Sequence, residues 1–184
     1  MKKKIIIIAS IISVLVIIIA AVVVSLFVEW EKFTYDIEEY SAVRERYEFL
    51  PAIDELGDGE DLSFTHFKKS QFIFSSNSYT LTVKCSDSEF IDYKKKFDAE
   101  FVYEENKIKH DKDEVEKEPS FELDSFEFKT LSFKKYRIEY PRQIVFVGFS
   151  DEKNEIVFVV FEDEDRDYIE GSFEDCLKSD CGWQ

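Results

Sequence analysis

The residues best suited to chemistry are carboxylates close to the C-terminus. Asp163, Asp165 and Asp167 alternate along the chain, and Glu174 follows eleven residues after Asp163. Alternating carboxylates that converge on an ion, closed by a bidentate glutamate at the twelfth position, are the ligands of a helix-loop-helix calcium site. The sixth position of that pattern requires glycine, and here it is Tyr168. Two interpretations follow: these four acids bind calcium, or they form the solvated end of a strand.

Nucleophilic catalysis finds little support in the sequence. His66 and His110 are the only histidines, and no Gly-x-Ser-x-Gly motif occurs. Serine hydrolysis requires a serine, a histidine and an acid that the fold brings together around a positioned nucleophile. Acid pairs, Asp54 and Glu55 among them, could act on glycosides only at a suitable separation in space. The sequence therefore predicts no catalytic residue, and a carboxylate-based surface hydrolase is the alternative.

The three cysteines permit two states. Cys176 and Cys181 are close enough in sequence to close a small disulfide loop, but they lack the two-residue spacing of a redox motif. No histidine lies near them to complete a zinc site. A disulfide and a pair of thiols both fit this pattern. Cys85 falls on the apolar side of an alternating segment, which predicts a buried thiol.

The charge of the chain restricts its partners. Its 184 residues include 40 Asp and Glu against 24 Lys and Arg, which gives a formal net charge of −16. A field of this sign repels phosphate backbones, so we expect no nucleic acid partner. Cationic partners or metal ions are favoured instead.

An uncharged apolar stretch at residues 5–28 predicts a transmembrane helix. At about 1.5 Å per residue it would be roughly 36 Å long, enough to cross a hydrocarbon layer about 30 Å thick. Three lysines precede it and acids follow it. By the positive-inside rule, residues 1–4 are cytoplasmic and everything after residue 28 lies outside, so the expected location is the cell membrane, with a single span acting as a signal anchor. A cleavable signal peptide is the alternative.

Residues 29–48 are predicted to form a juxtamembrane helix. Phe33, Ile37, Tyr40 and Val43 are spaced by three or four residues, which places them on one helical face. Trp30 would join Phe33 at the level of the lipid headgroups. Trp30, Phe33 and Tyr40 are the predicted partner contacts.

Residues 49–184 predict one α+β domain with an antiparallel sheet and packed helices. Segments rich in β-branched and aromatic residues predict strands at residues 62–68, 71–74, 79–85, 121–123, 126–131, 133–140, 144–149 and 155–161. The last two are apolar enough to form a central hairpin covered on both faces. Ser86 and Ser172 each offer a helix capping signal. The serine-rich residues 75–78 predict a turn, residues 57–61 an acidic loop, and the charged residues 104–119 a mobile surface loop.

Several stretches resemble uncharacterised small membrane-anchored proteins of Gram-positive bacteria. They are residues 50–57, 71–76 with 79–81, and 149–154. The resemblance covers most of the chain after residue 28 and brings no known activity or functional residue with it. It implies a single recurring domain at a bacterial cell surface.

These features together predict a membrane-anchored extracytoplasmic binding or assembly module without enzymatic activity. Its expected partners are the membrane, through the single span, and another membrane or envelope protein. The alternative is a surface carboxylate-based hydrolase or a calcium-binding module. No cofactor other than calcium is expected.

Overall fold

The structure is a computed structural model that describes residues 2–56, 62–71 and 74–183. The acidic loop predicted at residues 57–61 lies outside the described residues. The helices are α1 (Lys2–Phe27), α2 (Glu38–Arg46), a single 3-10 turn η1 (Ile53–Glu55), α3 (Asp87–Glu100), α4 (Phe133–Tyr136) and α5 (Phe173–Ser179). The strands are β1 (Trp30–Thr34), β2 (Leu62–Gln71), β3 (Phe74–Lys84), β4 (Ser120–Leu123), β5 (Phe126–Thr130), β6 (Gln143–Ser150) and β7 (Glu155–Glu162).

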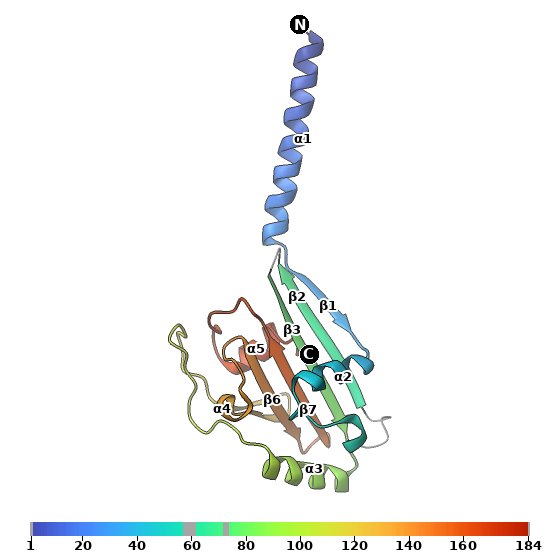
Figure 1. The fold of residues 1–184 in the computed structure, drawn as a ribbon, viewed down its shortest axis with the longest axis vertical. Coiled ribbons are helices and arrows are strands. Elements are labelled where there is room, and N and C mark those ends of the chain that lie inside the picture. Colours follow the sequence, from blue (N-terminus) through green and yellow to red (C-terminus); the bar gives the residue numbers. More distant parts are fainter. Residues whose placement is uncertain (1, 57–61, 72–73, 184) are drawn as a thin grey trace.

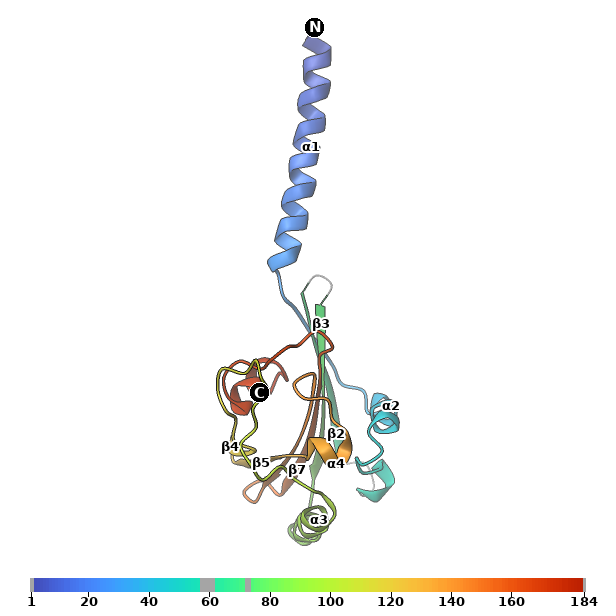
Figure 2. The same ribbon diagram turned by 60° about the vertical axis from the view of Figure 1, so that its left-hand side comes forward.

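All seven strands belong to one antiparallel sheet. Their order is β1-β2-β3-β7-β6-β5-β4, and every neighbouring pair runs antiparallel. Helices pack on both faces of this sheet (Figures 1 and 2). The predicted α+β domain with an antiparallel sheet is therefore confirmed.

The sheet separates two hydrophobic cores. α2, η1 and α3 cover one face, where Tyr40, Phe97 and Phe158 are buried. α5 and the segment before β4 cover the other, where Phe128, Phe146 and Phe173 are buried. β6 and β7 supply side chains to both cores, because successive residues of a strand point to opposite faces. The prediction of a central hairpin covered on both faces is confirmed.

The two predicted helix caps are also confirmed. Ser86 caps α3 and Ser172 caps α5, each accepting a hydrogen bond from the backbone N–H three residues later. In both boxes the residue at that position, Glu89 or Asp175, accepts a hydrogen bond from the backbone N–H of the cap. Each reciprocal pair satisfies two donors that the first turn of a helix leaves unpaired.

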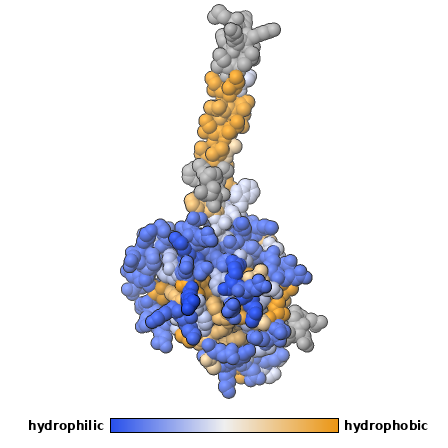
Figure 3. Space-filling view, viewed as in Figure 1, coloured by the Kyte–Doolittle hydropathy of each residue, from blue (hydrophilic) through white to orange (hydrophobic). Residues whose placement is uncertain are grey.

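The prediction of a transmembrane helix is wrong. Among the residues that the structure describes, no helix is both long enough and apolar enough to cross a bilayer. α1 projects away from the sheet, and its side chains are described from Ser10 to Val24, an apolar stretch (Figures 1 and 3). The predictions of a signal anchor and of a single-pass location in the cell membrane depend on that helix, so they are wrong for the same reason.

The helix predicted for residues 29–48 is only partly right. Trp30–Thr34 forms β1, and the helix begins at Glu38. Strand pairing determines the conformation of the first half of this segment. β1 pairs with β2, and Phe33 lies opposite Phe67, with 4.7 Å between the ring centroids. An aromatic pair across two strands stabilises that pairing, and the helical spacing of the aromatic residues does not reveal it.

Two other local predictions are wrong. Residues 75–78 are part of β3 and do not form a turn, because Ser76 and Ser78 are buried within the sheet. Residues 133–140 do not form a strand: the first four are α4, capped by Ser132, which accepts a hydrogen bond from the backbone N–H of Lys135 at 3.5 Å. Serine composition and apolar alternation are only correlated with turns and strands, and tertiary packing overrides them.

Candidate functional site

A groove lies at one end of the sheet, where β3 begins and β7 ends. Its volume is about 1120 Å³. The C-terminal end of α2 and the residues after it form one wall, and the segment from Tyr136 to Gln143 forms another. The lining includes seven carboxylates, three arginines and four aromatic side chains: Glu45, Glu48, Glu139, Glu162, Asp163, Glu164, Asp165, Arg46, Arg137, Arg142, Tyr47, Phe49, Tyr79 and Tyr136. We call this surface the sheet-end groove.

Glu162 holds the centre of the sheet-end groove together. Both of its carboxylate oxygens accept from Arg46 Nη1, at 2.9 and 2.8 Å. The Tyr47 hydroxyl donates to the same carboxylate at 2.6 Å. Burial, followed by this hydrogen bond and the charge of Glu162, raises the pKa of Tyr47 above its ordinary range, so the phenol stays protonated as a donor.

Arg46 also connects the groove to the sheet. Its guanidinium lies 5.2 Å from the centroid of the Tyr79 ring. Partial burial opposes its charge, but hydrogen bonds to Tyr79 and Glu162 and the charge of Glu162 outweigh this and raise the pKa of Arg46. A guanidinium held by a carboxylate and an aromatic face has few rotamers available, so this part of the lining is preorganised.

His66 lies behind the groove, on β2. Its Nδ1 is 3.1 Å from Glu39 Oε2, and its Nε2 is 3.0 Å from Asn77 Oδ1. The ring also packs on Tyr79, with 4.6 Å between centroids. Asn77 and Tyr79 both line the sheet-end groove. Both ring nitrogens are therefore occupied, and neither is left to activate a nucleophile.

The four acids predicted to bind calcium do not converge. Asp163 contacts Arg166 at 3.6 Å, Asp167 contacts Lys112 at 2.7 Å, and Glu174 contacts Lys178 at 2.6 Å. Asp165 is exposed at the rim of the sheet-end groove. Across the described part of the chain, no three His, Cys, Asp or Glu side chains gather in a way that could hold a metal ion. The geometry lends the calcium prediction no support.

The three predicted partner contacts have different surroundings. Trp30 is exposed on β1, at 68% of its maximum. Phe33 is half-buried against Phe67. Tyr40 is buried in the core, and its hydroxyl donates to the carbonyl of Pro51 at 2.7 Å. Of the three, Trp30 has the side chain most open to a partner. Asp54 and Glu55 lie on η1 and do not line the sheet-end groove.

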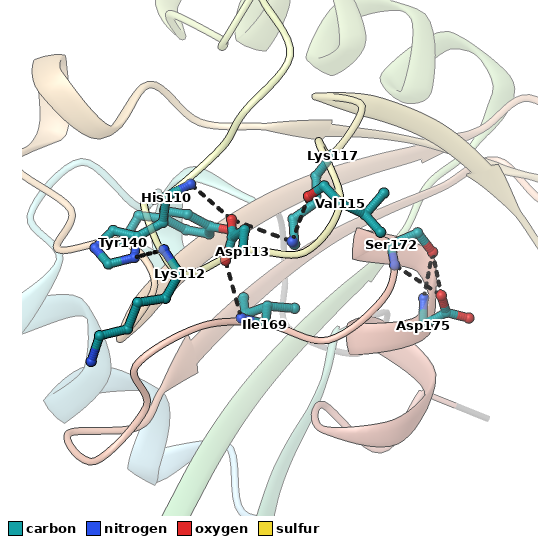
Figure 4. A network of polar contacts seen from close by, with 9 residues as sticks. All are labelled: His110, Lys112, Asp113, Val115, Lys117, Tyr140, Ile169, Ser172 and Asp175. Carbon is teal, nitrogen blue, oxygen red and sulfur yellow. Dashed lines mark hydrogen bonds and ion pairs between the residues drawn. The ribbon is translucent and has the colours of Figure 1, made fainter.

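A second polar cluster joins residues 104–119, predicted to be a mobile loop, to the rest of the domain (Figure 4). Asp113 and Lys117 form an ion pair at 3.3 Å, and both side chains are fully buried. Tyr140 donates its hydroxyl proton to Asp113 at 2.6 Å, and the backbone N–H of His110 donates to it at 2.9 Å. Lys117 also donates to the carbonyl of Val115 at 3.0 Å. This cluster fixes residues 104–119 against the domain, so the mobile-loop prediction is wrong.

The cysteine pair lies at the end of α5. Cys176 and Cys181 are both buried and present as thiols. A hydrogen bond to Cys181, together with burial, raises the pKa of the Cys176 thiol, which keeps it protonated. Cys85 is half-buried, and its thiol lies 3.9 Å from the carbonyl of Val83.

Sequence reasoning missed the sheet-end groove because its parts come from four distant segments. Arg46 and Glu162 are 116 residues apart in the chain. No local pattern signals such a pairing, although the cluster of acids at residues 163–167 includes part of one edge of the site. Comparison with protein-family models, curated proteins and solved structures finds no match for this chain.

Proposed function

We propose that this protein is a binding module and not an enzyme, and that the sheet-end groove binds an extended basic segment of another protein. The observation that carries the proposal is the groove itself, with a volume of about 1120 Å³ and seven carboxylates against three arginines in its lining. Ligand sites in proteins are concave and are commonly about 300–1,000 Å³. This groove, at about 1120 Å³, is slightly larger than that range, which suits several residues of a peptide.

The charge of the lining favours a cationic ligand. Glu45, Glu48 and Glu164 are exposed at the rim, where lysine or arginine side chains could reach them. Glu162 is already neutralised by Arg46. The net charge of −16 also attracts a basic segment from a distance and raises its association rate.

The aromatic side chains give the groove apolar contact area. Phe49 and Tyr136 pack together at 4.5 Å between centroids, and Tyr47 packs on Phe49 at 5.8 Å. Such rings bury the stems of lysine and arginine while their charged ends reach the acids. A mixed lining of this kind suits a peptide better than a free metal ion.

The test is a calorimetric titration with two blocked hexapeptides at low ionic strength, one of alternating lysine and threonine and one of alternating glutamate and threonine. The basic peptide should bind and the acidic one should not. Replacing Glu48 and Glu164 by glutamine should weaken binding about five-fold, since exposed ion pairs contribute about 0.2–1 kcal/mol each.

The matched control replaces Glu122 and Glu152 by glutamine. Both are exposed, neither lines the sheet-end groove, and the change in net charge is the same. This variant should bind as the unmodified protein does. The proposal fails if the basic peptide does not bind, or if both double variants lose the same affinity, because that would mean attraction to the overall charge alone.

A further inference from the structure

His66 sits between two oxygen atoms that come from different elements. Glu39 of α2 places a carboxylate oxygen 3.1 Å from Nδ1, and Asn77 of β3 places its amide oxygen 3.0 Å from Nε2. Both partners are acceptors in this arrangement. A neutral imidazole has one N–H donor, whereas an imidazolium has two. The arrangement therefore matches His66 in its protonated form.

Loss of the proton leaves one of these contacts unsatisfied. The remaining N–H stays with Glu39, because a hydrogen bond to a carboxylate is stronger than one to a neutral amide. Nε2 then carries a lone pair that faces the amide oxygen of Asn77. A half turn of the amide removes this conflict, since it exchanges the oxygen for the NH₂ group at almost the same shape.

We propose that the protonation state of His66 sets the orientation of the Asn77 amide, and through it the hydrogen-bonding character of the sheet-end groove. Asn77 lines this groove, and it lies directly opposite Glu162 in the pairing of β3 with β7. At acidic pH the amide oxygen binds His66 and the NH₂ group is left for the groove. At alkaline pH the NH₂ group binds His66 and the oxygen is left. The inference deepens the proposed function and rests on it for its effect on ligand binding.

The charged groups around His66 come from α2 and from the sheet. From α2, the Glu39 carboxylate lies 3.1 Å from the His66 ring, and the Arg46 guanidinium lies over the Tyr79 ring. From the sheet, Tyr79 packs on the ring, and Thr34 of β1 is the cross-strand neighbour. Lys68 lies two residues along β2 on the same face and is exposed, and Lys32 is opposite it.

The orientation of the Asn77 amide should directly affect how tightly a basic ligand binds. An ammonium or guanidinium group can only donate hydrogen bonds, so it meets an acceptor at alkaline pH and a competing donor at acidic pH. Binding of the lysine-threonine peptide should therefore be about five-fold tighter at pH 8 than at pH 5.5, the effect of about one hydrogen bond.

The decisive experiment follows ¹⁵N resonances of the complete chain from pH 5 to pH 8, the range in which histidine changes charge. The Asn77 side-chain amide should shift with the same midpoint as the His66 ring nitrogens. In the variant His66→Gln that shift should disappear, and in the control His110→Gln it should persist. An Asn77 amide that does not follow the His66 ring in the unmodified protein overturns the inference, whether or not either variant folds.

This readout needs no ligand, so it separates the two proposals. Amide coupling without peptide binding refutes the proposed function and supports the link between His66 and Asn77. Peptide binding whose pH dependence is unchanged in His66→Gln, with a static Asn77 amide, refutes the inference and leaves the proposed function standing.

Discussion

At the scale of single residues, the Asp113–Lys117 ion pair is the one most important for stability, because both charged side chains are fully buried. Taking a charge out of water costs several kcal/mol, and only a partner with good geometry offsets that cost. Tyr140 and the backbone N–H of His110 donate to the same Asp113 oxygen that Lys117 contacts, Oδ2, and the backbone N–H of Ile169 donates to Oδ1 at 3.5 Å. The cluster can therefore be tested by removing one partner at a time.

Lys117→Met should lower the free energy of unfolding by about 3–5 kcal/mol, because it leaves the Asp113 carboxylate buried without its cation. Urea denaturation followed by circular dichroism measures this directly. The double variant Asp113→Asn with Lys117→Met should recover part of the loss. Lys107→Met is a suitable control, since Lys107 pairs with Glu118 on the surface and should change stability little. Equal losses in the two single variants would contradict the assignment.

Asp113 also predicts how stability depends on pH. Burial works against its charge, but hydrogen bonds from Tyr140 and His110 and the charge of Lys117 outweigh burial and lower the pKa of the carboxyl. The stability it contributes is thus complete above the ordinary aspartate value of about 3.9 and is lost as pH falls through the lower value in the folded state.

Asp113→Asn should therefore be less stable than the unmodified protein at pH 7 and lose less further stability between pH 5 and pH 2. Urea midpoints measured at each pH test this expectation. Parallel curves for the two proteins would show that Asp113 is not responsible for the acid sensitivity.

At the scale of elements, β6 packs closely against both neighbouring strands at Gly148. A Cβ atom added at Gly148 would lie 2.6 Å from Phe128 Cε1 and 2.7 Å from Val157 Cγ2. Gly148→Ala should therefore lower the free energy of unfolding by about 1–3 kcal/mol, through overpacking of the core. Thermal unfolding measures the loss, and a second change, Phe128→Leu, should restore part of it. If Phe128→Leu adds its own loss instead, the contact is not the cause.

The elements that could be predicted from sequence are those specified by local signals. The caps of α3 and α5 and the apolar hairpin of β6 and β7 each have such a signal. β1 has no such signal, and α4 has only the Ser132 cap, without the reciprocal acid that the caps of α3 and α5 have. Their conformations depend on neighbours that only the fold provides. Ser76 and Ser78 show the same limit, since small polar side chains suit a turn and a tightly packed strand equally well.

At the scale of the whole molecule, charge and topology act together. The net charge of −16 opposes compaction through self-repulsion. Surface ion pairs contribute little to stability. Added salt should therefore weaken the repulsion between acids more than it weakens the attraction within ion pairs. The melting temperature should rise by several degrees between 10 mM and 500 mM sodium chloride. Calorimetry measures this shift, and a variant with several surface acids replaced by glutamine should show a smaller one. A fall in melting temperature would mean that favourable pairs dominate.

The functional surface is a property of the whole molecule, which is why sequence reasoning located only part of it. The sequence shows a cluster of acids at residues 163–167, of which residues 163–165 line the groove, but their neighbours Arg46, Asn77 and Arg142 come from other parts of the chain. His66 and Glu39 are 27 residues apart, and the pairing of β1 with β2 helps to bring them together. Long-range strand pairing of this kind leaves no periodic trace in a single sequence.

β1 is the outermost strand on its side of the sheet, within the part of the chain that the structure describes. The outer backbone of such a strand can recruit a strand from a neighbouring molecule and so begin an aggregate. Here Glu31 and Lys32 are exposed in its middle. Charged side chains on an outermost strand, lysine above all, are a common protection against such pairing. Concentrated solutions of this protein should therefore resist fibril formation from this border.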